Sequence, residues 1–79
     1  MDKITVNVEW HEVEGIWTAT SDDIWGLAAQ SSDLELLKQK VLPMIADLVE
    51  LNKVAVSGST IPIHFVAHST RVLSLQHVA

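Results

Sequence analysis

The stretch Gly15–Glu35, GIWTATSDDIWGLAAQSSDLE, decides the fold that we predict for this chain. Ile16–Ser21 alternates its side chains between two faces in the manner of a strand. Asp22–Gly26 is a turn, because aspartates start turns and its final glycine tolerates a positive φ. Leu27–Gln30 is a short third strand, and a helix begins soon after it. The stretch therefore predicts strand, turn, strand and helix in that order.

The helix is predicted over residues 33–53. Ser32 and Glu35 form a capping box, with the serine at the N-cap and the glutamate three residues later. Behind them, apolar residues recur at spacings of three and four and predict a core-facing stripe: Leu34, Leu37, Val41, Met44, Leu48 and Leu51. Pro43 falls on the polar side, where the carbonyl that it leaves free can bind water. We expect one continuous, bent helix.

Two more strands flank this region, at about residues 3–11 and 61–68. The first alternates apolar and polar side chains with a period of two. The last contains Pro62, which cannot donate a ladder hydrogen bond and therefore favours an edge strand or a strand start. The strands at 16–21 and 27–30 complete the set, while 52–60 is a predicted loop and 69–79 has no clear period.

The element order is βββαβ, which predicts an α+β fold. An antiparallel meander of three strands makes the third strand parallel to the first, and the helix then crosses over to place the fourth strand beside the first. The predicted sheet order is 3-2-1-4. One helix covers only one face of such a sheet, so the other face or an edge is left for water, the C-terminal segment or a partner.

Length and composition predict a single domain over residues 1–79 that gains from self-association. A chain of 79 residues buries a small core, and the absence of cysteine excludes disulfides and thiolate metal sites. We therefore expect a homodimer. No apolar run approaches the roughly 20 residues that span a bilayer, and the N-terminus enters a strand pattern without a leader. These features predict a cytoplasmic protein without membrane contact.

The net charge of −5 is unevenly distributed. Five acids and no Lys or Arg lie between residues 9 and 23: Glu9, Glu12, Glu14, Asp22 and Asp23. The five bases are scattered, so the clustered cations that bind phosphates are missing and nucleic-acid binding is not expected. Acidic surfaces attract basic partners, although the same charge also keeps a small domain soluble.

No residue pattern predicts catalysis, a metal or a cofactor. His64 and His68 share one face of a strand but lie about 13 Å apart there. Both cannot approach one zinc ion to about 2 Å. The glycines are isolated and form no phosphate loop, and no serine lies in a nucleophile elbow. We expect a non-enzymatic protein.

Four segments together resemble the N-terminal domain of HicB-type antitoxins: Gly15-Ile16-Trp17, Ser21-Asp22-Asp23-Ile24, Gly26-Leu27 and Asp33-Leu34-Glu35. The whole chain resembles a family of small stand-alone HicB-like domains of uncharacterised function, with the pattern VEWH…GIW…SDDI-x-GL…LxxLKxKV…P…ELN…IPIHFVAH. The resemblance implies a sheet related to a degenerate RNase H-like fold. It also implies binding to a small basic toxin that cleaves RNA.

The chain departs from that family at two places. Full antitoxins carry a C-terminal DNA-binding module, and residues 69–79 are too short for one, so direct DNA binding is not expected. Trp25 stands where the family motif has proline. The RNase H-like kinship also raises metal-dependent nuclease activity, but the fourth strand has no acid to accompany Glu9, so we do not expect it.

The interpretation that follows is a protein-binding domain that sequesters a basic toxin. Its expected contact residues are Asp22, Asp23, Ile24 and Trp25, and an aromatic residue beside carboxylates is typical of interface hot spots. Three further acids would steer the partner: Glu9, Glu12 and Glu14. In the alternative without a binding role, the turn is solvated and Trp25 folds back over the core edge. The alternative function is a homo-oligomeric interaction domain without a toxin.

Overall fold

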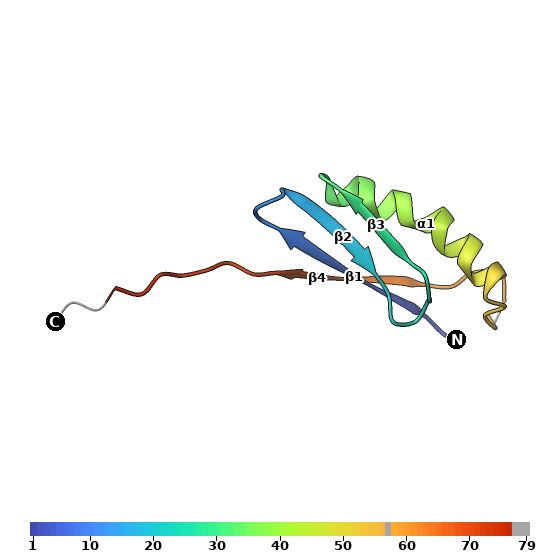
Figure 1. Cartoon of the computed structure of the whole chain (residues 1–79). Coiled ribbons are helices and arrows are strands. Elements are labelled where there is room, and N and C mark those ends of the chain that lie inside the picture. Colours follow the sequence, from blue (N-terminus) through green and yellow to red (C-terminus); the bar gives the residue numbers. More distant parts are fainter. Residues whose placement is uncertain (57, 77–79) are drawn as a thin grey trace.

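A computed structural model describes residues 1–56 and 58–76 of the chain. In chain order the elements are β1 (Ile4–His11), β2 (Ile16–Thr20), β3 (Ala28–Ser31), α1 (Leu34–Leu51) and β4 (Ile63–Ser69). The strands form one sheet, α1 lies over one of its faces, and the chain after β4 projects away from the rest (Figure 1). This projection makes the molecule elongated, with extents of 63 × 22 × 18 Å.

The sheet has the order β3-β2-β1-β4. β1 pairs antiparallel with β2, and β2 pairs antiparallel with β3, whereas β4 lies parallel to β1. The α+β fold, the three-strand meander and the order 3-2-1-4 are thereby confirmed. Pro62 directly precedes β4, and β4 is an edge strand. Both agree with the prediction made from the missing N–H of Pro62.

The core lies between α1 and the even-numbered residues of β1. Ile4, Val6 and Val8 are fully buried, in the alternation that their period of two predicted. The other buried side chains come from β2, the turn after it and the helix: Ala19, Ile24, Leu27, Leu37, Val41 and Ile45. Each large apolar side chain removed from water in this way stabilises the fold by about 1.5–3 kcal/mol.

The helix begins one residue later than the capping box predicted. Asp33 is the N-cap, and its side-chain oxygen accepts a hydrogen bond from the backbone N–H of Leu36 at 2.9 Å. Ser32 lies outside the helix and Glu35 is its second residue, so the predicted box is wrong. A carboxylate serves this position well because it also faces the positive end of the helix dipole.

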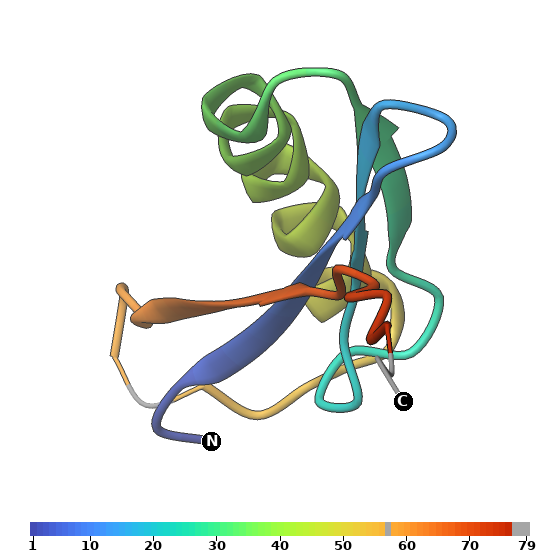
Figure 2. The same ribbon diagram turned by 90° about the vertical axis from the view of Figure 1, so that its left-hand side faces the viewer.

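The predicted apolar stripe of α1 is largely buried or half-buried, but its last member, Leu51, is exposed. Pro43 lies on the exposed side, and the helix continues through it, so the predicted continuity is confirmed. Viewed from the end where the C-terminal segment projects, α1 lies on one side of the sheet (Figure 2). Within residues 1–56 and 58–76, no helix is long and apolar enough to cross a membrane.

Candidate partner-binding site

The turn between β2 and β3 is fixed to the sheet through the backbone of Thr5. The Thr5 N–H donates to Asp23 Oδ2 at 2.7 Å, and the Thr5 carbonyl accepts from Ser21 Oγ at 2.6 Å. β1–β2 pairing ends at Asn7 and Thr20, before Thr5 is reached. The side chains of Ser21 and Asp23 therefore satisfy the backbone groups of Thr5 after β2 has left the sheet. Two turn side chains thus replace one strand residue.

The same serine also holds the turn internally. Ser21 Oγ accepts hydrogen bonds from the N–H of Asp23 at 3.1 Å and from the N–H of Ile24 at 3.3 Å. Ile24 and Leu27 then direct their side chains into the core. A turn with two buried anchors and a saturated hydroxyl has few alternative conformations.

Trp25 stands between those anchors and is 84% exposed. Its carbonyl accepts a hydrogen bond from Asn52 Nδ2 at 3.0 Å, which ties the turn to the end of α1. Gly26 follows with φ +93°, a conformation that favours glycine. The backbone is therefore held on both sides of an indole that faces water, and Trp25 does not fold back over the core edge.

The structure separates the predicted contact residues of this turn into three kinds. Trp25 and Asp22 are exposed and free to meet a partner. The Asp23 carboxylate is committed to Thr5, although its residue is exposed. Ile24 has no exposed surface, so the prediction that its side chain contacts a partner is wrong. Its side chain belongs to the buried core cluster, together with Leu37 and Val41 of α1.

The other predicted acids lie elsewhere on the molecule. Glu12 and Glu14 are in the hairpin between β1 and β2, at the far end of the strand from Thr5. Seven residues of strand span about 23 Å, so these acids do not join Asp22 in one patch. Glu9 lies between the two ends and is exposed on the sheet face opposite α1.

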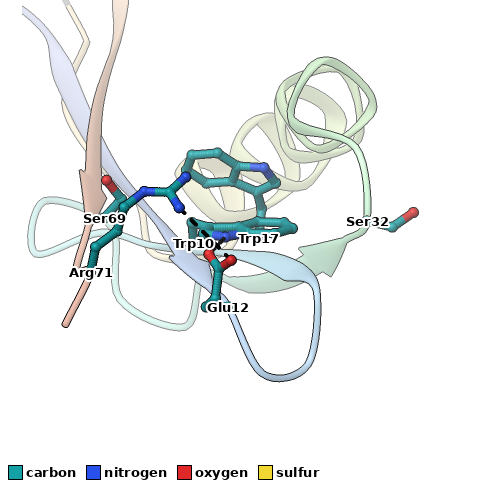
Figure 3. Close-up of a pocket in the computed structure, with 6 residues that line it drawn as sticks. All are labelled: Trp10, Glu12, Trp17, Ser32, Ser69 and Arg71. Atoms are coloured by element: carbon teal, nitrogen blue, oxygen red, sulfur yellow. Dashed lines mark hydrogen bonds and ion pairs between the residues drawn. The ribbon is translucent and has the colours of Figure 1, made fainter. Parts of the chain in front are cut away.

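A second group of residues, which the sequence interpretation missed, lies at the hairpin end. Trp10 and Trp17 are a cross-strand pair whose ring centroids are 5.4 Å apart at an angle of 49°. Glu12 Oε2 accepts a hydrogen bond from Trp10 Nε1 at 2.7 Å, and Glu12 Oε1 lies 3.9 Å from Arg71 Nη1 (Figure 3). With two serines these residues line an open hollow of about 390 Å³.

The tryptophan pair had a signal in the sequence, whereas the arginine had none. Both tryptophans belong to the inward faces of strands joined by a short hairpin, so their pairing follows once the hairpin register is fixed. Arg71 comes from a segment without any period, and only the parallel pairing of β4 with β1 brings it to Glu12. Chemically, the hollow combines aromatic surface with one carboxylate, and Arg71 of the same chain supplies the cation that lies 3.9 Å from that carboxylate.

The sheet face opposite α1 is polar and open. His11 Nε2 lies 2.9 Å from Thr18 Oγ1, and His68 Nε2 lies 3.4 Å from Asn7 Oδ1. In the part of the chain that the structure describes, no three His, Asp or Glu side chains gather where they could hold a metal ion.

These features define the class: a small α+β domain with a mixed four-stranded sheet, one helix and a fixed aromatic turn. The chain belongs to the family described as Domain of unknown function (DUF1902), whose model matches residues 3–76. It is similar to the hypothetical protein TTHA1013 from the extremely thermophilic bacterium Thermus thermophilus. That protein is 36% identical to this chain in sequence. Its crystal structure matches with a TM-score of 0.63, and the match covers 90% of this chain and 99% of that one. A search of curated proteins finds no match.

Proposed function

We propose that this domain is a non-catalytic, HicB-type antitoxin-like domain that binds and sequesters a small basic, RNA-cleaving protein. The observation that carries the proposal is Trp25, which is 84% exposed on a turn whose backbone is fixed from both sides and which also exposes Asp22. The proposed relation to degenerate RNase H-like folds rests on the sequence resemblance together with the βββαβ order.

A fixed, exposed tryptophan suits binding energetically. Tryptophan is enriched among the residues that dominate interface energies, because its large ring loses much contact with water when a partner covers it. The turn is already held by Ser21, Asp23 and Asn52, so little conformational entropy remains to be lost on binding.

Charge supplies the second element of recognition. The net charge of −5 attracts a basic partner over distances of about a Debye length, roughly 8–10 Å at physiological salt. Asp22 is exposed in the same turn as Trp25 and adds a negative charge to it. The acids of the hairpin act only through this long-range field, since they lie at the other end of β1.

The direct test is co-expression with the basic protein encoded by a neighbouring reading frame, followed by calorimetry and an RNA-cleavage assay. The wild-type domain is expected to bind and to suppress cleavage. Trp25→Ala is expected to weaken binding by about 30-fold or more, the effect of losing a hot-spot residue. Val13→Ala is the matched control, because Val13 is apolar, 95% exposed and at the opposite end of the sheet. Unchanged affinity of Trp25→Ala, or no binding by the wild type, would contradict the proposal.

One observation favours the alternative function, a homo-oligomeric interaction domain without a toxin. Three apolar side chains on the segment after β4 are exposed to water: Val72, Leu73 and Leu75. Self-association is compatible with both functions, so only capture of the basic protein separates them.

A further inference from the structure

The outer edge of β4 lacks the features that normally prevent edge strands from pairing. The strand is seven residues long, with the sequence IHFVAHS, and contains no Lys, Arg, Asp or Glu. Among residues 1–56 and 58–76, its only pairing partner is β1. Natural edges are usually short, charged or bulged, because a bare edge presents free N–H and C=O groups. The opposite edge strand, β3, has only four residues.

The free groups on this edge can be named from one hydrogen bond. The N–H of Ile4 donates to the carbonyl of Pro62 at 3.0 Å, so even-numbered residues of this segment direct their backbone groups toward β1. Backbone direction alternates along a strand. The N–H and C=O groups of four residues therefore point outward: Ile63, Phe65, Ala67 and Ser69.

The chain continues beyond β4 as an extended segment, residues 70–76, that projects from the domain (Figure 1). Its three apolar side chains, Val72, Leu73 and Leu75, are 92%, 80% and 74% exposed. Leu73 and Leu75 have the same parity as Ile63 and Phe65, which face the helix side of the sheet. Such a run of exposed apolar side chains is typical of an interaction surface.

A groove of matching chemistry lies between α1 and the beginning of β4. It has a volume of about 390 Å³, and Leu42, Val49, Ile61 and Ile63 contribute to its walls. None of the residues that line it is charged. The groove therefore has no charge that would select a charged partner. The apolar C-terminal segment of a second copy matches its chemistry and is always present at the same concentration as the groove.

We propose that two copies of this chain pair antiparallel through their β4 edges, and that the C-terminal segment of each covers the α1–β4 groove of the other. A two-fold axis between identical antiparallel strands pairs residues whose numbers have an even sum. Odd residues then meet odd residues, so Leu73 and Leu75 lie on the helix side of the partner sheet, where its groove is.

The register follows from the requirement that both leucines reach that groove. With the axis between the two copies of residue 68, Leu73 lies opposite Ile63 and Leu75 lies opposite Ile61 of the other copy. Residue 68 directs its backbone groups to β1, so the axis falls on a non-hydrogen-bonded pair, and Ala67 pairs with Ser69 on either side. The two sheets become one sheet of eight strands.

Sedimentation equilibrium or light scattering tests the assembly with the full chain. The wild type is expected at twice the chain mass of 8.7 kDa. Leu73→Asp/Leu75→Asp is expected to raise the dimer dissociation constant on the order of 100-fold or more, because the leucines lose their apolar contacts. These residues are exposed in the single chain, so the monomer stays folded by circular dichroism. Val13→Asp, in the hairpin, is the control that keeps the dimer.

Ala67→Pro is the matching test of the edge itself. It removes one outward N–H and leaves the ladder to β1 intact, since that ladder uses the even-numbered residues. A folded monomer is the expected result. A wild type that is monomeric at about 100 μM, or tail and edge variants that remain as dimeric as the wild type, would overturn the proposal.

A cysteine scan fixes the register, because the natural chain contains no cysteine. His68→Cys is expected to form an intermolecular disulfide under mild oxidation, since opposite residues of a non-hydrogen-bonded pair lie about 4.5 Å apart. Val66→Cys is not, because its two copies would lie about 13 Å apart. Crosslinking through Ala28→Cys on β3, or none at position 68, refutes the arrangement. Trp25→Ala is expected to leave the dimer intact, so failure here and failure of partner capture are separate results.

Discussion

Replacing Ser21 by alanine tests whether the β2–β3 turn is held as the structure indicates. The hydroxyl donates to the Thr5 carbonyl at 2.6 Å and accepts from the N–H groups of Asp23 and Ile24. The variant keeps the backbone and loses only this oxygen. All three partners then need water in a half-buried place, because Ser21 is half-buried and Ile24 is fully buried.

The expected cost is worked from those bonds. The short bond to Thr5 contributes about 1 kcal/mol, and leaving its carbonyl and one of the N–H groups poorly hydrated adds about 1 kcal/mol more. We therefore expect the free energy of unfolding to fall by about 2 kcal/mol. For a domain of this size that corresponds to a lower Tm by about 8–16 °C.

Urea denaturation followed by tryptophan fluorescence measures this change, with wild type and variant at the same protein concentration. Ser32→Ala is the matched control, since Ser32 is exposed and lies outside the helix. Its effect is expected to stay within about 0.5 kcal/mol. A loss below about 0.5 kcal/mol in Ser21→Ala would refute the view that this serine replaces a ladder position.

Two further stability predictions follow from the same structure. Asp33→Ala removes the N-cap acceptor of the Leu36 N–H and is expected to cost about 1 kcal/mol in urea denaturation, whereas a larger loss in Ser32→Ala than in Asp33→Ala would restore the serine as the cap. Trp17→Ala removes half of the tilted pair with Trp10 and is expected to cost about 2–3 kcal/mol, with loss of near-ultraviolet circular dichroism. Trp17→Phe keeps an aromatic partner and serves as its control; equal losses in both variants would argue against a ring–ring contribution.

The fold follows from the sequence where periodicity acts over several residues. The alternation of β1 and the three-and-four spacing of α1 both persist in the structure, because burial of one face selects them. Periodicity does not decide whether Ser32 or Asp33 is the N-cap. Both residues suit the position, and β3 extends to Ser31, which brings the helix start one residue further along the chain.

The candidate site was predicted only in part, because turn residues follow no period. Ile24 stands between two aspartates and Trp25 in the sequence, and only the packing of the turn against the core shows that Ile24 is the buried anchor while Trp25 is exposed. Leu51 has the right spacing for the helix stripe, but it is the last helical residue and remains exposed. Arg71 reaches Glu12 through a strand pairing across most of the chain, which no local pattern encodes.

The acidic pair in the turn has two different roles, and this determines how charge must be tested. Asp23 accepts the Thr5 N–H at 2.7 Å, so replacing it by lysine removes a structural acceptor together with a charge. Asp22 is exposed, and the structure gives it no such partner among the described residues. A lysine at Asp23 would weaken binding through a loosened turn even if charge played no part. Only Asp22→Lys separates the attraction of a basic partner from the geometry that presents Trp25. If the attraction exists, Asp22→Lys associates more slowly with the partner, the difference from the wild type shrinks at high salt, and the stability of the domain is unchanged.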